Sequence, residues 1–427
     1  MLPWILLILL FVLILIDIPI AFALGIVAII ALIVTGYPLS IVPLILADSL
    51  ISFVLLAVPL FIATGEIMTR GQVSEALVEV SSSLVGFIRG GLAHVNIFVS
   101  MLFANISGSA VADAASLGSI LIPEMEKRGY PKDFSVAVTS TSASIGILIP
   151  PSIAMILYAV VADVSVARMF LAGFIPGSLY GFSLMIGAYI IARRRKYPSY
   201  EPFSLSNVVR KGRRAVWATI IPIVILGGIL TGVCTTTEAA GLAAMIALCL
   251  ALFVYKGIRI NQVPSVLLSC SKRAGAVLMI MSTSMVLSWY LIREGIPQAL
   301  AAWMGTLTSS TPLVILILII FISLCGVILH GASMMLMLVP VLLPLTREFG
   351  IDPIHFGVLF TMGICVGEQT PPVASVLLVT TSVAHLPIVD SLRALLPFFL
   401  ILVANTFLVA YVPFFSLFLP NLVLGPP

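Results

Sequence analysis

Two groups of small, polar and helix-breaking residues interrupt an otherwise apolar chain, and their types suit the binding of ions and carboxylates. The first group runs from Asn105 to Ser109 and is followed by a break at 146–151; the second lies near Gly326 and is followed by a break at 367–372. Proline has no N–H, so carbonyls upstream of it lose their hydrogen-bond partners. Freed carbonyl oxygens suit Na⁺, and the exposed N-termini of half-helices suit a carboxylate.

The composition places these groups in a membrane. The chain has 427 residues, of which 61% are hydrophobic and 9% are charged. Soluble domains carry roughly 25% charged residues, so a water-soluble enzyme is excluded, as is a disordered chain. Apolar runs at 18–34, 170–192 and 395–419 have about the 20 residues that a helix needs to cross a lipid bilayer. The net charge of +4 gives no sign of a nucleic-acid partner.

The chain repeats itself at an offset of 221 residues. Pro150-Pro151 matches Pro371-Pro372, and Gly146 matches Gly367. Glycine and proline fix the shape of the backbone, so their co-registration is informative. The sequence therefore predicts a first repeat over 1–192, a basic cytoplasmic linker over 193–214, and a second repeat over 215–427.

Each repeat is predicted to contain one re-entrant hairpin, one broken helix and one interfacial arm helix. Both hairpins carry polar tips, and their arms are too short to cross the bilayer. The predicted segments are hairpins at about 92–123 (inner) and 313–344 (outer), broken helices at about 134–162 and 355–384, and arms at about 71–91 and 292–311. The resulting fold class is an all-α polytopic membrane protein with about ten transmembrane helices.

Charge distribution predicts that the two repeats are inverted. Each repeat has five crossings, an odd number, so the second enters the membrane upside down. With this threading, 18 of the 21 lysines and arginines fall on the predicted inside, and only Arg168, Arg293 and Arg347 fall outside. This bias follows the positive-inside rule. Both chain termini are then expected on the outer, periplasmic side.

Three segments carry a resemblance to a known family. They read RGGLAHVNIFVSMLFANISGSAVADAASLGS, then IPEMEKRGYPKDFSVAVTSTSASIGILIPPSIAMILYAVVADVS, and GVCTTTEAAGLAA just after the midpoint. The chain resembles the large membrane subunit of tripartite ATP-independent periplasmic (TRAP) transporters over nearly its whole length. The resemblance implies an elevator-type fold in a bacterial inner membrane and Na⁺-coupled uptake of organic acids such as C4-dicarboxylates or sialic acids. It also implies two partners, a small four-helix membrane subunit and a soluble periplasmic substrate-binding protein.

The residue pattern and the resemblance converge on two Na⁺ sites with the substrate between them. The first site is predicted to comprise Asn105, Ser107, Gly108, Ser109, Gly146 and Pro150, and the second Gly326, Gly367 and Thr370. Ionisable groups buried in a membrane are costly and are usually functional. The candidates for substrate binding are Ser109, Asp113, Ser144, Thr283, Ser284, His330 and Glu368.

Other interpretations of these residues and of the chain remain open at this stage. Membrane serines often bond to the carbonyl four residues earlier, and Asp113 could simply cap a hairpin arm. Asp17 and Glu238 are expected to act as helix caps. A standalone Na⁺/dicarboxylate carrier or an ion antiporter of related hairpin fold is the alternative function. An enzyme is disfavoured, since Asp113 and Glu368 lie apart with no paired acid beside either.

Overall fold

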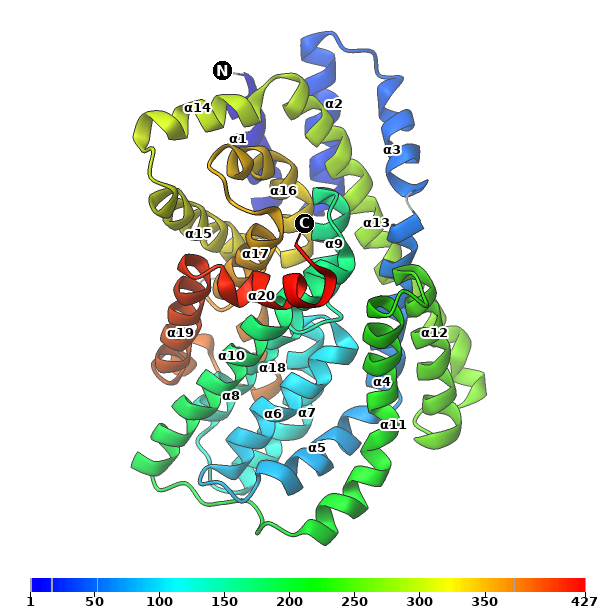
Figure 1. Ribbon diagram of the computed structural model, residues 1–427, viewed down its shortest axis with the longest axis vertical. Coiled ribbons are helices and arrows are strands. Elements are labelled where there is room, and N and C mark those ends of the chain that lie inside the picture. Colours follow the sequence, from blue (N-terminus) through cyan, green and yellow to red (C-terminus); the bar gives the residue numbers. More distant parts are fainter. Residues whose placement is uncertain (1, 17, 52, 372, 427) are drawn as a thin grey trace.

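The computed structural model describes residues 2–16, 18–51, 53–371 and 373–426, so the predicted cap Asp17 and the repeat residue Pro372 lie outside the described residues. Every regular element in these ranges is helical (Figure 1). Seven of the described helices are long and apolar enough to cross a membrane, judged by length and composition. Two of the seven, Thr311–Ile328 and Gly331–Glu348, are the arms of the predicted outer hairpin. With 18 residues each they are long enough to cross, so the prediction that these arms are too short is wrong by length and composition. Each predicted broken helix is a pair of shorter helices. The all-α polytopic fold class is confirmed.

The first half begins with three apolar helices and ends with α10, which has 29 residues. Its helices are α1 (Leu2–Leu15), α2 (Ile20–Thr35), α3 (Ile41–Ile51), η1 (Phe53–Leu56), α4 (Ala57–Arg70), α5 (Val73–Val85), α6 (Gly91–Ser107), α7 (Ala110–Lys127), α8 (Lys132–Ala143), η2 (Ser144–Ile147), α9 (Ile153–Ala162) and α10 (Val166–Arg194). Two of the predicted features fall here: α6 and α7 cover the inner hairpin, and α8 and α9 cover the first broken helix.

The second half contains a similar series. Its helices are α11 (Leu205–Leu230), α12 (Thr236–Cys249), η3 (Leu250–Val254), η4 (Ile260–Gln262), α13 (Val263–Arg293), α14 (Ile296–Leu307), α15 (Thr311–Ile328), α16 (Gly331–Glu348), α17 (Pro353–Gly367), α18 (Ser375–Ala384), α19 (Ile388–Tyr411) and α20 (Phe414–Leu424). The bounds 110–127 of α7 and 331–348 of α16 differ by 221 at both ends, the offset of the sequence repeat. The cap at the start of α12 is as expected, because Thr235 and Glu238 form a reciprocal capping box there.

Helix packing separates the molecule into two groups of helices. In one, α4 packs against α12, α2 and α3 pack against α13, and α11 packs against α5 and α12. In the other, α7 and α19 pack against α8, α15 packs against α17, and α18 packs against α7 (Figure 1). The groups meet where α5 contacts α6 and where α13 and α14 contact α16. We call them the frame group (α1–α5 and α11–α14) and the hairpin group (α6–α10 and α15–α20).

The basic linker is tied to both groups. Between α10 and α11, the Tyr200 N–H donates to the carbonyl of Gly86 at 2.8 Å, and the Gly90 N–H donates to the carbonyl of Pro198 at 3.1 Å. Lys211 forms an ion pair with Glu201 at 2.8 Å and donates to the Ser82 hydroxyl on α5 at 3.1 Å. These contacts connect the α5 end of the frame group to the start of α6.

The pKa of Glu201 makes the Lys211–Glu201 ion pair depend on pH. Burial pushes the pKa of Glu201 upward. The hydrogen bonds from Lys211 and Ser82, together with the positive charges of Lys211 and Arg210, outweigh burial and hold that pKa below its usual value of 4.5. Stabilisation by a carboxylate with a lowered pKa is present above the unfolded-state pKa and is lost as pH falls through the folded-state value. We expect Glu201→Gln to cost at most about 1 kcal/mol at pH 7, since the pair is partly solvated. Thermal unfolding should show the difference from wild type shrinking below pH ~4.

A matched substitution separates this effect from the general loss of an acidic residue. Glu75→Gln removes an exposed carboxylate from the same helix, α5, that receives the Lys211 contact. Its unfolding midpoint should stay at the wild-type value at both pH values. Equal effects of the two substitutions at pH 7 would contradict a role for the Lys211–Glu201 pair.

Candidate functional site

The inner hairpin turns at a glycine and a serine. Gly108 ends α6 with φ +61°, a conformation that favours glycine, and Ser109 caps α7 by accepting from the Ala112 N–H at 3.5 Å. The Ser107 hydroxyl donates to the Oδ1 carboxylate oxygen of Asp113, which is fully buried in the first turn of α7. Its other oxygen, Oδ2, has no hydrogen-bond partner among the described residues.

The first break lies against this tip. After α8 and the turn of η2, the chain passes Pro150 and Pro151 and restarts at α9, where Ser152 accepts from the Met155 N–H at 3.4 Å. A Cβ atom placed on Gly146 would overlap the Asp113 carboxylate. One placed on Gly108 would lie 3.0 Å from the Pro151 carbonyl oxygen.

The structure brings together four residues of the predicted first Na⁺ site, Ser107, Gly108, Ser109 and Gly146, and adds Asp113 to them. The remaining two members are placed differently. The Asn105 amide donates to the carbonyl of Met101 at 3.0 Å, within its own helix. Pro150 lies in the break itself, four residues beyond Gly146.

The outer hairpin and the second break also touch. A Cβ atom placed on Gly326 would lie 3.1 Å from the Cα of Gly367, so the two predicted glycines form a close backbone crossing of α15 and α17. The third predicted member, Thr370, donates to the Val366 carbonyl at 2.7 Å and so satisfies its hydroxyl within its own segment.

Glu368 connects the second break to the start of α16. Its carboxylate Oε1 accepts from the Gly331 N–H at 3.2 Å, and its side chain is 2% exposed. Its Oε2 has no hydrogen-bond partner among the described residues. His330, which precedes α16, is exposed and lies at the same tip.

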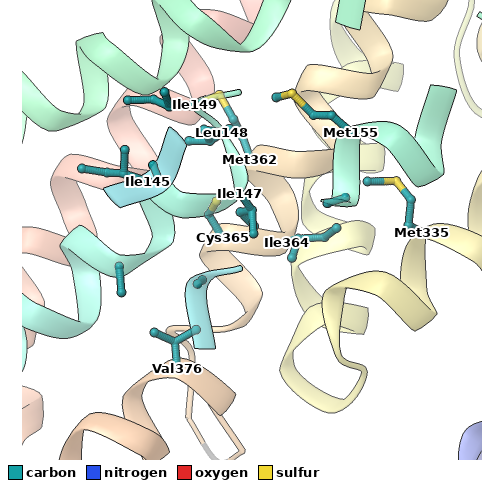
Figure 2. Packing of buried hydrophobic residues seen from close by; sticks show 14 of the residues in the cluster. Ile145, Ile147, Leu148, Ile149, Met155, Met335, Met362, Ile364, Cys365 and Val376 are labelled. Atoms are coloured by element: carbon teal, nitrogen blue, oxygen red, sulfur yellow. The ribbon is translucent and has the colours of Figure 1, made fainter. Parts of the chain in front are cut away.

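A buried amide joins the two breaks to each other. Gln369 is fully buried. Its Nε2 donates to the Ser140 carbonyl at 2.8 Å and to the Ser144 hydroxyl at 2.9 Å. Its Oε1 accepts from the Ser140 hydroxyl at 2.5 Å. Nearby, the Cys365 thiol donates to the Ser144 carbonyl, and these two residues are themselves 221 positions apart. Apolar side chains such as Ile147 and Met362 fill the surrounding space (Figure 2).

We expect Gln369→Leu to destabilise the junction between the breaks. Leucine has a similar size but leaves the Ser140 and Ser144 groups without their partner, which costs about 1–3 kcal/mol for buried polar groups. Thermal unfolding of the purified chain should therefore show a lower midpoint. The exposed Gln298→Leu, on α14, is the matched control and should leave the midpoint unchanged. A wild-type midpoint for Gln369→Leu would contradict the role of this amide.

A cavity of about 520 Å³ lies between the two hairpin tips and the frame group. Ser107, Gly108, Ser109, His330 and Glu368 line it from the hairpin group, and α4 and α13 line it from the frame group. The volume falls within the roughly 300–1,000 Å³ of small-molecule sites. Three substrate candidates, Ser109, His330 and Glu368, therefore share one cavity.

The other substrate candidates lie elsewhere. Asp113 sits behind the inner tip, and Ser144 is engaged by Gln369. Thr283 and Ser284 donate to carbonyls four residues earlier in α13, at 2.9 and 2.7 Å, and neither is among the residues that line the cavity. This is the usual arrangement of hydroxyl side chains in apolar helices.

The cavity also contains a charged cluster that the sequence did not predict. Glu66 on α4 is 8% exposed and pairs with Arg70 at 2.7 Å and with Arg273 on α13 at 3.0 Å. All three residues line the cavity. The sequence does show Glu66 inside an apolar span, one turn before Arg70. It has no local pattern that indicates Arg273, which lies 207 positions later.

Comparison with known proteins identifies the family of the chain. The family model described as "Tripartite ATP-independent periplasmic transporter, DctM component" matches residues 7–415. The chain belongs to this family. It is 39% identical to the C4-dicarboxylate TRAP transporter large permease protein DctM of Pseudomonas aeruginosa, with 86% of each chain covered. The resemblance to the TRAP large subunit is thereby confirmed, and with it a transporter permease in a membrane.

Relatives of this TRAP permease differ in their stated substrates and in length. The chain is 37% identical to the sialic acid TRAP transporter large permease protein SiaM of Vibrio cholerae, with 88% of each chain covered. It is 32% identical to the isethionate TRAP transporter permease protein DctMQ of Oleidesulfovibrio alaskensis, with 94% of this chain but 64% of that one covered. The YdaH transporter of Alcanivorax borkumensis shares the fold alone, with a TM-score of 0.58, 15% identity and 84% of each chain covered.

Proposed function

We propose that the chain carries out Na⁺-coupled uptake of a small organic acid across a bacterial inner membrane. The observation that supports this most directly is the cavity enclosed by two hairpin tips, each packed on a break in a helix. Irregular backbone at membrane depth is tolerated where it lines a cavity, and secondary transporters use it to bind ions and substrate near the bilayer midplane.

The first Na⁺ site is proposed at the inner tip. Ser107, Gly108, Ser109 and Gly146 surround the Asp113 carboxylate, whose Oδ2 lacks a partner among the described residues. A buried carboxylate oxygen without a partner is costly, and a bound cation removes that cost. The second Na⁺ site is proposed at the Gly326–Gly367 crossing and Thr370, where the chain unwinds after α17.

The proposed mechanism is of the elevator type. The two halves are taken as inverted repeats, with both termini periplasmic. The hairpin group moves as one body, held together by Gln369 and by the packing of α7, α8 and α18. The frame group stays fixed.

Na⁺ orders the hairpin tips before substrate enters, and the loaded hairpin group then slides past α4 and α13. Arg70 and Arg273, which line the cavity, belong to the side predicted to be cytoplasmic, and we propose that the cavity faces that side in this arrangement.

Two partners are proposed: a soluble periplasmic binding protein and a small four-helix membrane subunit. Support for the second comes from the longer relative DctMQ, because the part outside the match leaves room for a fused subunit. The frame group exposes large apolar side chains on α11 and α12, such as Ile223 and Met245, that bilayer lipid or such a subunit would cover.

The binding-protein requirement separates this proposal from the alternative, a standalone carrier of related fold. The chain is reconstituted in liposomes with its small subunit, and uptake of labelled organic acid is measured with and without the cognate binding protein. We expect uptake only when the binding protein is present. Equal uptake without it would overturn the tripartite part of the proposal and favour the standalone carrier.

A further inference from the structure

The cavity has basic residues on one wall and an acidic residue on the other. On the frame side, one carboxylate, Glu66, is shared between the guanidinium groups of Arg70 and Arg273, which leaves an excess of one positive charge. On the hairpin side, the charged residue lining the cavity is Glu368, beside the exposed His330. Guanidinium groups bind carboxylates strongly, so the frame wall suits the acid end of a substrate.

Glu368 changes what the hairpin wall can bind. The N-terminus of a helix normally attracts an anion. Here the chain's own carboxylate occupies the N-terminus of α16, because Glu368 Oε1 accepts from the Gly331 N–H at 3.2 Å. Gly331 allows this approach, since a Cβ atom there would lie 3.1 Å from that same oxygen. The Glu368 carboxylate therefore occupies the position in which a substrate carboxylate would otherwise bind.

The second oxygen of Glu368 indicates what the wall accepts instead. Glu368 is 2% exposed, and its Oε2 has no hydrogen-bond partner among the described residues. A buried carboxylate oxygen can only accept hydrogen bonds, and leaving it unpaired is costly. A donor group of the substrate would satisfy it, whereas a second carboxylate beside it would be repelled.

From these contacts, and resting on the proposed transport function, we propose that the substrate is a small monocarboxylate carrying a hydrogen-bond donor at its far end. The carboxylate binds at Arg70 and Arg273. The donor, an ammonium or hydroxyl group, binds at Glu368. The chain thereby discriminates against dicarboxylates. Its relative in Pseudomonas aeruginosa, by contrast, is named as a C4-dicarboxylate transporter permease.

Three linear C4 acids that differ only at the far carbon test the proposal. They are 4-aminobutyrate (ammonium), 4-hydroxybutyrate (hydroxyl) and succinate (carboxylate). Equilibrium binding of each to the purified full chain is measured in Na⁺-containing buffer. We expect at least one of the first two acids to bind ~10-fold or more tightly than succinate, which is the scale of one charge-assisted contact. The comparison between these two acids identifies the donor.

Glu368→Gln should reverse this preference. The amide keeps the shape of the side chain but supplies donors, so succinate should gain ~10-fold or more relative to the donor-bearing acids. Glu348→Gln, an exposed glutamate at the far end of α16, is the matched control and should keep the wild-type ratio. If Glu368→Gln fails to fold, Gly331→Ala is the second variant: its Cβ atom would lie 2.8 Å from Ile364 Cγ2 and 3.1 Å from Glu368 Oε1, and we expect it to shift the ratio in the same direction.

Three outcomes would overturn the proposal: wild-type chain that binds succinate most tightly, wild-type chain that binds neither donor-bearing acid at millimolar concentration, or an unchanged ratio in Glu368→Gln. These outcomes are distinct from a failure of the proposed function. If the binding preference is as expected but no Na⁺-driven uptake occurs in liposomes, the transport mechanism falls and the selectivity of the cavity stands. If uptake is Na⁺-driven but succinate is preferred, the proposed selectivity is wrong and the transport mechanism stands.

Discussion

Gly146→Val is expected to reduce Na⁺-dependent uptake by at least ~100-fold. The Cβ atom would overlap the carboxylate of Asp113, and the two valine methyl groups would need still more room between the inner tip and the break. Overpacking of this kind typically costs about 1–3 kcal/mol in stability, which a folded membrane protein can survive. The proposed Na⁺ site, by contrast, requires Gly146 to lie against the Asp113 carboxylate, and valine would push these two residues apart. Uptake into proteoliposomes with and without Na⁺ is the measurement.

The chain offers a matched control for this substitution. A Cβ atom placed on Gly275, on α13, would have no neighbouring heavy atom within 4 Å, so Gly275→Val adds the same side chain to an open helix face. It should retain wild-type uptake. If Gly146→Val also retains full uptake at the same amount of folded protein, the proposed first Na⁺ site is not where we place it.

Asp113→Asn is expected to raise the Na⁺ concentration needed for half-maximal uptake by about 100-fold, equivalent to about 2.7 kcal/mol. Asparagine is close to aspartate in shape and can still accept a hydrogen bond from Ser107, but it removes the negative charge at the buried Oδ2 position. The loss should therefore appear in the Na⁺ dependence of transport and only weakly in the unfolding midpoint.

This substitution also decides between the two roles considered for Asp113. If Asp113 only supports the first turn of α7, asparagine replaces it at little cost, because it is also favoured near helix N-termini. An unchanged Na⁺ dependence would then be found, and the ion-binding role would be wrong. Asp163→Asn removes an exposed carboxylate at the end of α9 and should leave the Na⁺ dependence at its wild-type value.

Local sequence signals anticipated the helix breaks because glycine and proline act on the backbone directly. The turn at Gly108 and Ser109, the break before Pro151 and the interruption after Gly367 all follow from residues at the break itself. The repeat offset then placed α16 by reference to α7. Family resemblance added the class of transporter, which composition and periodicity do not specify.

Long-range side-chain partners could not be anticipated in the same way. Gln369 bonds to Ser140 at a separation of 229 residues, and this differs from the repeat offset, so the repeat gives no hint of the pair. The Glu66–Arg273 pair joins two helices whose contact is a property of the packed fold. Thr283 and Ser284 illustrate the opposite case, since polar side chains in an apolar helix suggested a site but satisfy their hydroxyls on their own backbone.

The most direct test of the central claim is uptake driven by a Na⁺ gradient alone. Proteoliposomes containing the chain and its small subunit, with the binding protein outside, are given labelled organic acid under an inward Na⁺ gradient. A K⁺ gradient of equal size, with the membrane potential clamped to the same value, is the comparison. We expect accumulation of the acid above its external concentration with Na⁺ only. Equal accumulation under both gradients would contradict Na⁺ coupling.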